Sequence, residues 1–389
     1  MTRSAYHGLF GRLADTAHHL RCRVLPAKNS TRSHNRIAVI RINNIGDVVS
    51  ATALIKNLRL CYPDTKITLI TNSACYKLLR DQAEVDDIVT FDSACVPREP
   101  SGIQKIRLAF VEGVRLRKLL KNRFHAAFFL EGPSRLLLIM FPAKIKIGFA
   151  SSNSFIGYFL DRQIPNERNH PNPTHRYIHY QRLLQLYHAE NIPFVRPKLN
   201  VSANADIKAH RWLFERGLDA PFMVIAVGGL AETKRWPLHH WCDFVKQFRE
   251  QNDIQIVLLG GPDERHLKPE VSEWGEVFDA IDTFDLASGA ALIRSACLFV
   301  GNDTSLMHIA VAVGTPSLAI FGGSDWYISG YDVDHFVPLH TNLSCQPCGL
   351  KTCPYGRPPP CLETISPSEV AARASAILAA SNEPERALS

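Results

Sequence analysis

The sequence lacks the long apolar run that a membrane-spanning helix requires. Such a helix needs about 18 or more consecutive apolar residues, and the run Leu136–Phe141 is far shorter. The N-terminus also lacks a secretory signal, because its first apolar residues alternate with Arg and His. These absences predict a cytoplasmic protein, and 389 residues are enough for two domains.

Two common nucleotide-binding motifs are also missing. No G-x-x-x-x-G-K-[ST] occurs, which excludes a P-loop enzyme. No G-x-G-x-x-G follows the first predicted strand, which argues against a dehydrogenase. One acid pair, Asp332 and Asp334, lies outside any predicted strand end, so we do not predict a metal site there.

Positive charge is concentrated at the N-terminus. The formal net charge is +7, and residues 1–36 supply +6 of it through seven basic side chains and one acid. The rest of the chain is nearly neutral, which argues against a nucleic-acid-binding protein. Apolar residues recur at helical spacing within this extension. The segment is therefore either a disordered tail or a basic amphipathic helix that binds the inner face of the inner membrane peripherally.

Strand and helix patterns alternate along the chain in two successive series. The first series begins with the strand Arg36–Ile42 and the second with the strand Met223–Val227. The stretch Ser151–Pro173 is polar and rich in Pro and Asn, so it is predicted to be a loop. The alternation predicts parallel, doubly wound sheets. We expect a basic extension (1–35) and two Rossmann-like domains (36–193 and 194–389), with ligands in the cleft between these domains.

The stretch Cys297–Phe321 has the pattern strand, helix, strand, and it places polar groups at the start of the helix. Asp303, Thr304 and Ser305 follow the strand, and His308 lies four residues beyond Thr304, so both face one side. The first N–H groups of a helix and its dipole attract anions. The stretch suits a ribose and a diphosphate, but an ordinary capped βαβ unit with a buried His has the same pattern.

Three other charged positions follow predicted strands. Asp47 comes after the first strand, where it is either a helix cap or a general base that takes a proton from a hydroxyl. Lys234 and Arg235 lie in a glycine-bearing loop, where a cation can hold a leaving diphosphate or can simply be solvated. Glu264 follows two glycines, and a carboxylate at such an edge can accept ribose hydroxyls.

Four of the ten cysteines cluster near the C-terminus as Cys345-x-x-Cys348-x4-Cys353-x7-Cys361. This spacing is typical of a metal site, and the surrounding Pro- and Gly-rich segment could not build its own core. A structural Zn or Fe would suit four thiolates; free thiols or disulfides are the alternative. The other six cysteines are scattered, which does not fit a secreted disulfide framework.

Several motifs occur in one order: Asn44-Ile-Gly-Asp-Val-Val49, Lys234-Arg-Trp-Pro237, Gly260-Gly-Pro-Asp-Glu264, and Gly301-Asn-Asp-Thr-Ser-Leu-Met-His308 with Gly314-Thr-Pro316. Together they resemble glycosyltransferase family 9, the lipopolysaccharide heptosyltransferases, from about residue 36 to residue 372. The resemblance implies a GT-B fold of two Rossmann-like domains that face a central cleft. It also implies inverting transfer of a heptose from a nucleotide-diphosphate sugar, typically ADP-heptose, to the lipopolysaccharide inner core, without a catalytic metal.

The resemblance also assigns roles to residues. It implies that Asp47 is the catalytic base, that Lys234 binds phosphate and that Glu264 binds ribose. Its phosphate-binding helix comprises Asp303, Thr304, Ser305 and His308. From position alone, Arg135 is a candidate for contact with phosphates and acidic sugars of the acceptor.

Two departures from the family pattern concern the donor side. Ser305–Leu306 stands where the family usually has Gly-Pro, and Gly229–Leu230 stands where it has hydroxyl residues before the lysine. Both leave the identity of the donor sugar open. Related transferases carry a similar cysteine cluster, which suggests iron.

Two other functions are compatible with this fold. GT-B domains also serve nucleotide-sugar epimerases, which need no acceptor. A non-catalytic sugar-nucleotide-binding protein is the other alternative, although the intact set of Asp47, Lys234 and Asp303 argues against it.

Overall fold

The computed structural model describes residues 36–90, 111, 114, 120, 124–130, 141–150, 157–166, 174–188 and 192–382. The described residues all belong to one compact unit, His34–Ser389. The predicted basic extension and Arg135 therefore lie outside the described residues. Within the described part, no helix combines the length and the apolar character needed to cross a bilayer.

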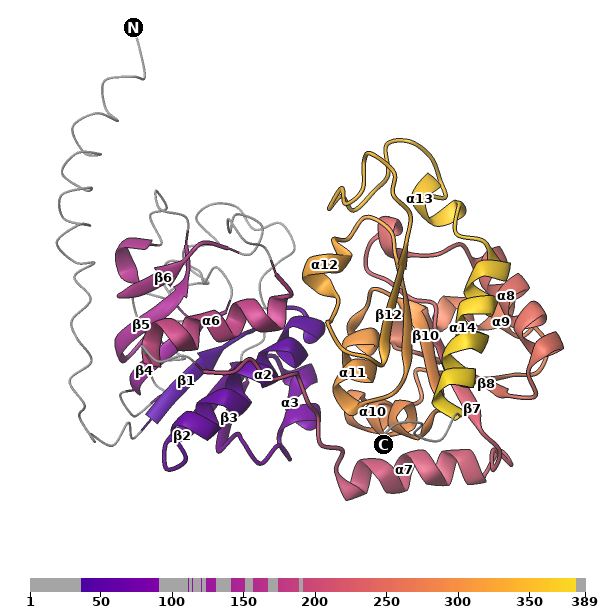
Figure 1. Cartoon of the computed structure of the whole chain (residues 1–389). Coiled ribbons are helices and arrows are strands. Elements are labelled where there is room, and N and C mark those ends of the chain that lie inside the picture. Colours follow the sequence, from indigo (N-terminus) through magenta and orange to yellow (C-terminus); the bar gives the residue numbers. More distant parts are fainter. Residues whose placement is uncertain are drawn as a thin grey trace, which may run out of the picture. The chain divides into compact units, whose positions relative to one another are not determined.

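The first half of the described chain forms a six-stranded parallel sheet in the order β3-β2-β1-β4-β5-β6 (Figure 1). Among the described residues three α-helices accompany it, and α2 packs against α6. The strands are β1 Arg36–Ile40, β2 Lys66–Thr71, β3 Asp87–Thr90, β4 Phe124–Phe129, β5 Ala143–Phe149 and β6 Arg162–Ile164, and the helices are α2 Ile45–Cys61, α3 Ser73–Leu79 and α6 Arg176–His188.

The second half forms another six-stranded parallel sheet, in the order β12-β11-β10-β7-β8-β9. The strands are β7 Phe222–Ala226, β8 Gln255–Gly260, β9 Val277–Ile281, β10 Leu298–Asn302, β11 Ser317–Phe321 and β12 Phe336–His340. The longer helices are α7 Ala203–Phe214, α8 Leu238–Gln251, α10 Leu286–Ser295, α11 Ser305–Val313 and α14 Pro367–Asn382.

Both sheets have the same doubly wound strand order, which confirms the predicted fold class. Counted from its first strand, each sheet runs 3-2-1-4-5-6. In such sheets ligands bind outside the carboxyl ends of the strands, where the strand order reverses. That point lies between β1 and β4 in one sheet and between β7 and β10 in the other. The predicted boundary between residues 193 and 194 stays a prediction.

Helix α2 of the first half also packs against α11 of the second half. One continuous cluster of buried apolar side chains includes Val48 from the first turn of α2 and Met307 from the first turn of α11. Both helices begin just after a central strand, β1 or β10. The starts of these two helices are therefore held together by a common apolar core.

Several elements differ from the sequence-based expectations, and three of them bear on the order of the two sheets or their covering helices. The predicted loop Ser151–Pro173 contains β6, a three-residue edge strand too short and polar to give a period-two pattern. Helix α7 was not predicted, although its buried residues Ala205, Ala209, Trp212 and Leu213 recur at helical spacing. Strand β12 was also not predicted. It contains Pro338, and it lies at the edge of its sheet, where proline is tolerated.

Candidate active site

Asp47 lies in the first turn of α2 and is buried, with 5% of its surface exposed. The residue before the helix, Asn44, has a positive φ of 59°, a conformation that Asn tolerates better than most residues. The Asn44 side-chain amide donates to Oδ2 of Asp47 at 3.0 Å. The turn after β1 thus points this carboxylate inward.

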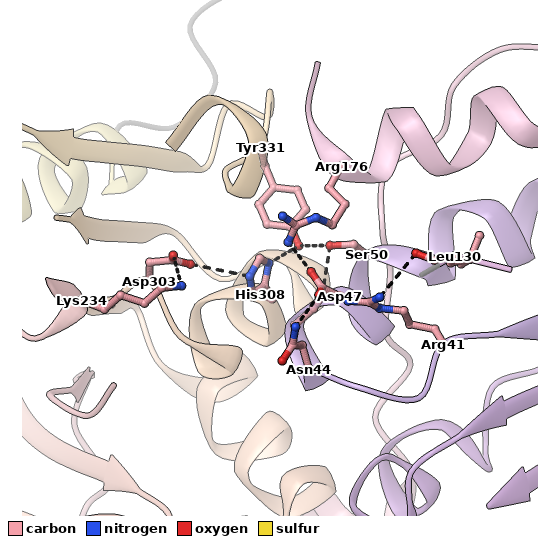
Figure 2. A network of polar contacts seen from close by, with 11 residues as sticks. Arg41, Asn44, Asp47, Ser50, Leu130, Arg176, Lys234, Asp303, His308 and Tyr331 are labelled. Atoms are coloured by element: carbon pink, nitrogen blue, oxygen red, sulfur yellow. Dashed lines mark hydrogen bonds and ion pairs between the residues drawn. The ribbon is translucent and has the colours of Figure 1, made fainter. Parts of the chain in front are cut away.

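Two arginines flank the Asp47 carboxylate (Figure 2). Arg41, just after β1, contacts one carboxylate oxygen, and Arg176, the first residue of α6, contacts the other. Arg41 also donates to the Leu130 carbonyl at 3.4 Å. Burial raises the pKa of Asp47, but the charges of Arg176 and Arg41 more than offset it and lower the pKa to about 2. The carboxylate is therefore ionised and tightly paired at neutral pH.

On the second sheet, Lys234 and Asp303 form an ion pair. Lys234 ends the short turn Glu232–Lys234, and its Nζ lies 2.7 Å from Oδ2 of Asp303, which follows β10. The Lys234 side chain is 35% exposed, whereas that of Asp303 is 3% exposed. Burial raises the pKa of Asp303, but Lys234 and His308 reverse the direction and lower it. The buried Asp303 carboxylate thus holds the partly exposed ammonium group of Lys234 in place.

The start of α11 offers groups that suit an anion. Thr304 is the N-cap residue, yet its side chain makes no capping hydrogen bond. Its buried Oγ1 finds no hydrogen-bond partner among the described residues. Ser305 is the first residue of the helix, where N–H groups have no intrahelical acceptor. A phosphate at this position would satisfy these donors.

His308 connects the two halves of the site. Its Nδ1 lies 2.6 Å from the hydroxyl of Tyr331, and its Nε2 lies 3.8 Å from Oδ1 of Asp303. Gly46 lies directly against the ring, since a Cβ built at this position would come within 2.1 Å of Cδ2 of His308. Only glycine allows the Asp47 turn to approach His308 this closely. The structure thus brings together Asp47, Lys234, Asp303 and His308 (Figure 2). Thr304 and Ser305 lie at the start of the helix that carries His308.

Burial lowers the pKa of His308 to about 4, although the Asp303 and Asp47 carboxylates act in the opposite direction. The unfolded chain then binds a proton between about pH 6.5 and pH 4 that the folded chain does not. We therefore predict that the free energy of unfolding rises with pH across this window, by an amount on the order of 3 kcal/mol relative to His308→Gln. Denaturant unfolding of both proteins at several pH values measures this. The prediction is wrong if the free energies of unfolding of the wild type and His308→Gln change equally with pH.

Glu264 lies beside the same loops. Its Oε2 accepts the Gly261 N–H at 2.8 Å, and a Cβ at Gly228 would come within 2.2 Å of its Oε1. The amide of Asn302, the last residue of β10, donates to the Gly228 carbonyl at 3.0 Å. Glu264 therefore packs against Gly228, and Gly228 is hydrogen-bonded to the end of the strand that precedes Asp303. In this position its carboxylate can accept hydrogen bonds from a ribose whose phosphates bind at the start of α11.

A family model described as glycosyltransferase family 9 (heptosyltransferase) matches residues 114–357. The chain belongs to glycosyltransferase family 9. This glycosyltransferase is 24% identical over 303 residues to lipooligosaccharide heptosyltransferase 2 of Haemophilus ducreyi. The aligned region covers 74% of this chain and 83% of the relative.

Solved structures confirm the GT-B fold of the transferase. It matches ADP-heptose lps heptosyltransferase II of E. coli with a TM-score of 0.69 at 18% identity, over 90% of this chain and 100% of that chain. It also matches a bacterial iron-containing dodecameric glycosyltransferase from enterotoxigenic E. coli with a TM-score of 0.57 at 13% identity, over 90% of this chain and 77% of that chain.

Four residues of the transferase's site were not predicted from its sequence. Arg41, Arg176 and Tyr331 reach the site from loops or helix ends that carry no recognised motif. Asn302 accepts the Trp236 N–H at 3.2 Å and donates to the carbonyls of Val227 and Gly228, so it ties both ends of the β7–α8 connection to the end of β10. Asn302 belongs to the motif that begins at Gly301, but the sequence assigned it no role.

The predicted cysteine cluster lies on the segment that supports Lys234. Cys345 and Cys348 are exposed and Cys361 is buried, and all four thiols are free. Burial, with the charges of the other three thiols, raises the pKa of Cys361 to about 11. Among the described residues, three potential ligand atoms lie within 4.8 Å of one another only at His239, His240 and Glu363. Metal binding by the cysteines stays a prediction.

Proposed function

We propose that this glycosyltransferase moves a heptose, or a related sugar, from a nucleotide-diphosphate sugar to the lipopolysaccharide inner core, with inversion and without a catalytic metal. ADP-heptose is the proposed donor. The observation that carries the proposal is the direct approach of the Asp47 turn to His308, which links a carboxylate on one sheet to the Lys234–Asp303 pair and the α11 start on the other.

In the proposed reaction an acceptor hydroxyl attacks the anomeric carbon opposite the diphosphate. The new C–O bond forms as the bond to the diphosphate oxygen breaks, and Asp47 takes the hydroxyl proton. Lys234 and the N–H groups at Thr304 and Ser305 stabilise the charge that develops on the diphosphate. Glu264 accepts hydrogen bonds from the ribose.

The two arginines make Asp47 a weak base until one of them is drawn away. A carboxylate with a pKa of about 2 takes protons poorly. A phosphate or an acidic sugar of the acceptor would compete for the guanidinium group of Arg176, whose side chain is 18% exposed. Asp47 would then regain basicity only when the acceptor is in place, which would limit wasteful hydrolysis of the donor.

Incubation of the purified protein with ADP-heptose and a heptose-deficient lipopolysaccharide core tests the proposal. Mass spectrometry should find the acceptor heavier by one heptose, and NMR should find an inverted anomeric centre. An isomerised sugar in donor-only reactions would instead favour an epimerase. Tight donor binding without any product would favour a non-catalytic sugar-nucleotide-binding protein.

We also propose a structural Zn or Fe held by Cys345, Cys348, Cys353 and Cys361. The segment between these cysteines holds the Lys234 turn: the Thr233 hydroxyl donates to the Leu350 carbonyl, and Arg357 pairs with Glu232 at 3.3 Å. A metal would supply only cross-linking of this Pro- and Gly-rich loop. The iron-containing relative of the same fold makes iron one candidate.

The expected metal content is about one equivalent of Zn or Fe in the purified wild-type protein, since four thiolates complete one tetrahedral site. Cys348→Ser should lose the metal and bind ADP more weakly, because the Lys234 turn loses its support. Cys242→Ser, which changes a half-buried cysteine elsewhere, should retain the metal. Elemental analysis that finds neither Zn nor Fe in the wild type would end this proposal.

A further inference from the structure

Ser50, Tyr331 and His308 form a chain of hydrogen bonds between α2 and α11 (Figure 2). Ser50 Oγ lies 3.1 Å from the Gly46 carbonyl and 3.0 Å from the Tyr331 hydroxyl, which in turn lies 2.6 Å from Nδ1 of His308. All three side chains are buried, with residue exposures of 2%, 5% and 6%. No part of the reaction proposed above uses Ser50 or Tyr331.

The direction of each hydrogen bond follows from counting hydrogens. A carbonyl only accepts, so the single hydroxyl hydrogen of Ser50 goes to Gly46, a common back-bond in helices. Ser50 must then accept from Tyr331, whose own hydrogen is thereby used. The Tyr331 oxygen consequently accepts from Nδ1–H of His308. In a neutral ring, the other nitrogen, Nε2, then carries a lone pair.

The opposite arrangement loses a hydrogen bond. If Tyr331 donated to Nδ1 of His308, its hydrogen could not reach Ser50, and either the Ser50–Tyr331 or the Ser50–Gly46 contact would have no hydrogen. The Nε2–H of His308 would point at Asp303, but 3.8 Å is too long for a hydrogen bond. The first arrangement makes three hydrogen bonds and the second makes two.

We propose that Ser50 and Tyr331 are positioning residues that hold neutral His308 as the Nδ1–H tautomer, so that its Nε2 and Oδ1 of Asp303 together accept hydrogen bonds from hydroxyl groups of the donor sugar. This inference rests on the proposed function. Lys234 binds the other oxygen, Oδ2, of Asp303 and leaves Oδ1 facing His308.

The ligand that suits these two groups is a polyol and not a diphosphate. Nε2 and Oδ1 are both acceptors, and a fully ionised diphosphate has no hydrogen to offer either of them. A sugar with neighbouring hydroxyls can donate to both. His308 is thereby assigned to recognition of the sugar, whereas the sequence predicted that it binds the diphosphate.

The tautomer can be measured without any ligand. Histidine-labelled protein at pH 7 gives ¹⁵N–¹H correlations that distinguish Nδ1–H from Nε2–H, and His308→Gln assigns the signal. We expect Nδ1–H in the wild type. Ser50→Ala frees the Tyr331 hydrogen for Nδ1, and Tyr331→Phe removes the acceptor of Nδ1–H, so both variants should shift the proton to Nε2. Ser295→Ala removes a similar back-bond from α10, at 3.2 Å, and should change nothing. Nε2–H in the wild type would overturn the inference.

Binding measurements test whether this tautomer of His308 serves to recognise the donor sugar. Tyr331→Phe should weaken the binding of ADP-heptose about tenfold, which corresponds to the loss of roughly one hydrogen bond. The affinity for ADP should stay unchanged, because ADP lacks the sugar. Equal losses for both ligands would overturn the assignment to the sugar. If the wild type binds neither ligand, the proposed donor is wrong and so is this assignment, whereas the tautomer measurement still decides the arrangement of hydrogens.

Discussion

Asp47→Asn is expected to lower turnover by about 10³-fold while ADP-heptose still binds. General bases contribute roughly 10²–10⁴-fold to such reactions. Asparagine has nearly the shape of aspartate and can keep the contact with Asn44, but it cannot take the proton of the acceptor hydroxyl. Steady-state kinetics and calorimetric titration of the donor measure the two effects separately. Near-normal turnover would remove Asp47 from its proposed role.

The same substitution should also reduce stability. Arg41 and Arg176 would lose their counter-ion, and their side chains are only 9% and 18% exposed. Breaking a buried ion pair from one side typically costs about 3–5 kcal/mol. Asp87→Asn is the matched control, because Asp87 pairs with Arg36 at 3.4 Å but its side chain is 54% exposed. This control should change unfolding and turnover little. Activity must therefore be compared at a temperature where Asp47→Asn is folded.

Lys234→Ala is expected to lower kcat/KM by about 10²–10³-fold and to weaken ADP binding. A fixed cation beside the leaving diphosphate stabilises negative charge that grows in the transition state, which accounts for an effect of this size. The substitution also leaves the buried Asp303 without its ion-pair partner, so the pKa of Asp303 should rise. The diphosphate would then bind more weakly at the start of α11, because the positive charge of Lys234 is missing there.

The neighbouring cation provides the control for Lys234. Arg235→Ala removes an exposed charge one residue away and should change kcat/KM less than threefold. Lys234→Arg keeps the charge and should retain much of the ADP affinity. The assignment fails if Lys234→Ala and Arg235→Ala have equal effects, because general electrostatic attraction would then explain both.

Sequence patterns predicted the sheets and the closeness of Asp303, Thr304 and His308, because these features depend on neighbours in the chain. Apolar strands of five or six residues alternate with helices, and Asp303, Thr304 and His308 lie within one turn and its helix. Their mutual placement follows from helical spacing alone. Helix α7 could have been predicted in the same way, from Ser202 as its N-cap and its apolar spacing.

The pairings that control Asp47 and His308 could not be predicted from the sequence. Arg176 is 129 residues from Asp47, and Tyr331 is 281 residues from Ser50. Such contacts depend on how two sheets and their helices pack, which no local period encodes. The closeness of Gly46 to His308 is of the same kind. Glycine permits close approach of the backbone, but no sequence pattern shows which residue approaches Gly46.

The most direct test of the whole account is a crystal structure of the protein with a fluorinated, non-transferable analogue of ADP-heptose. We predict that the diphosphate contacts Lys234 and the N–H groups at the start of α11, and that the anomeric carbon lies on the side facing Asp47. A nucleotide bound away from Lys234, or an anomeric carbon beyond reach of any acceptor hydroxyl held by Asp47, would contradict it.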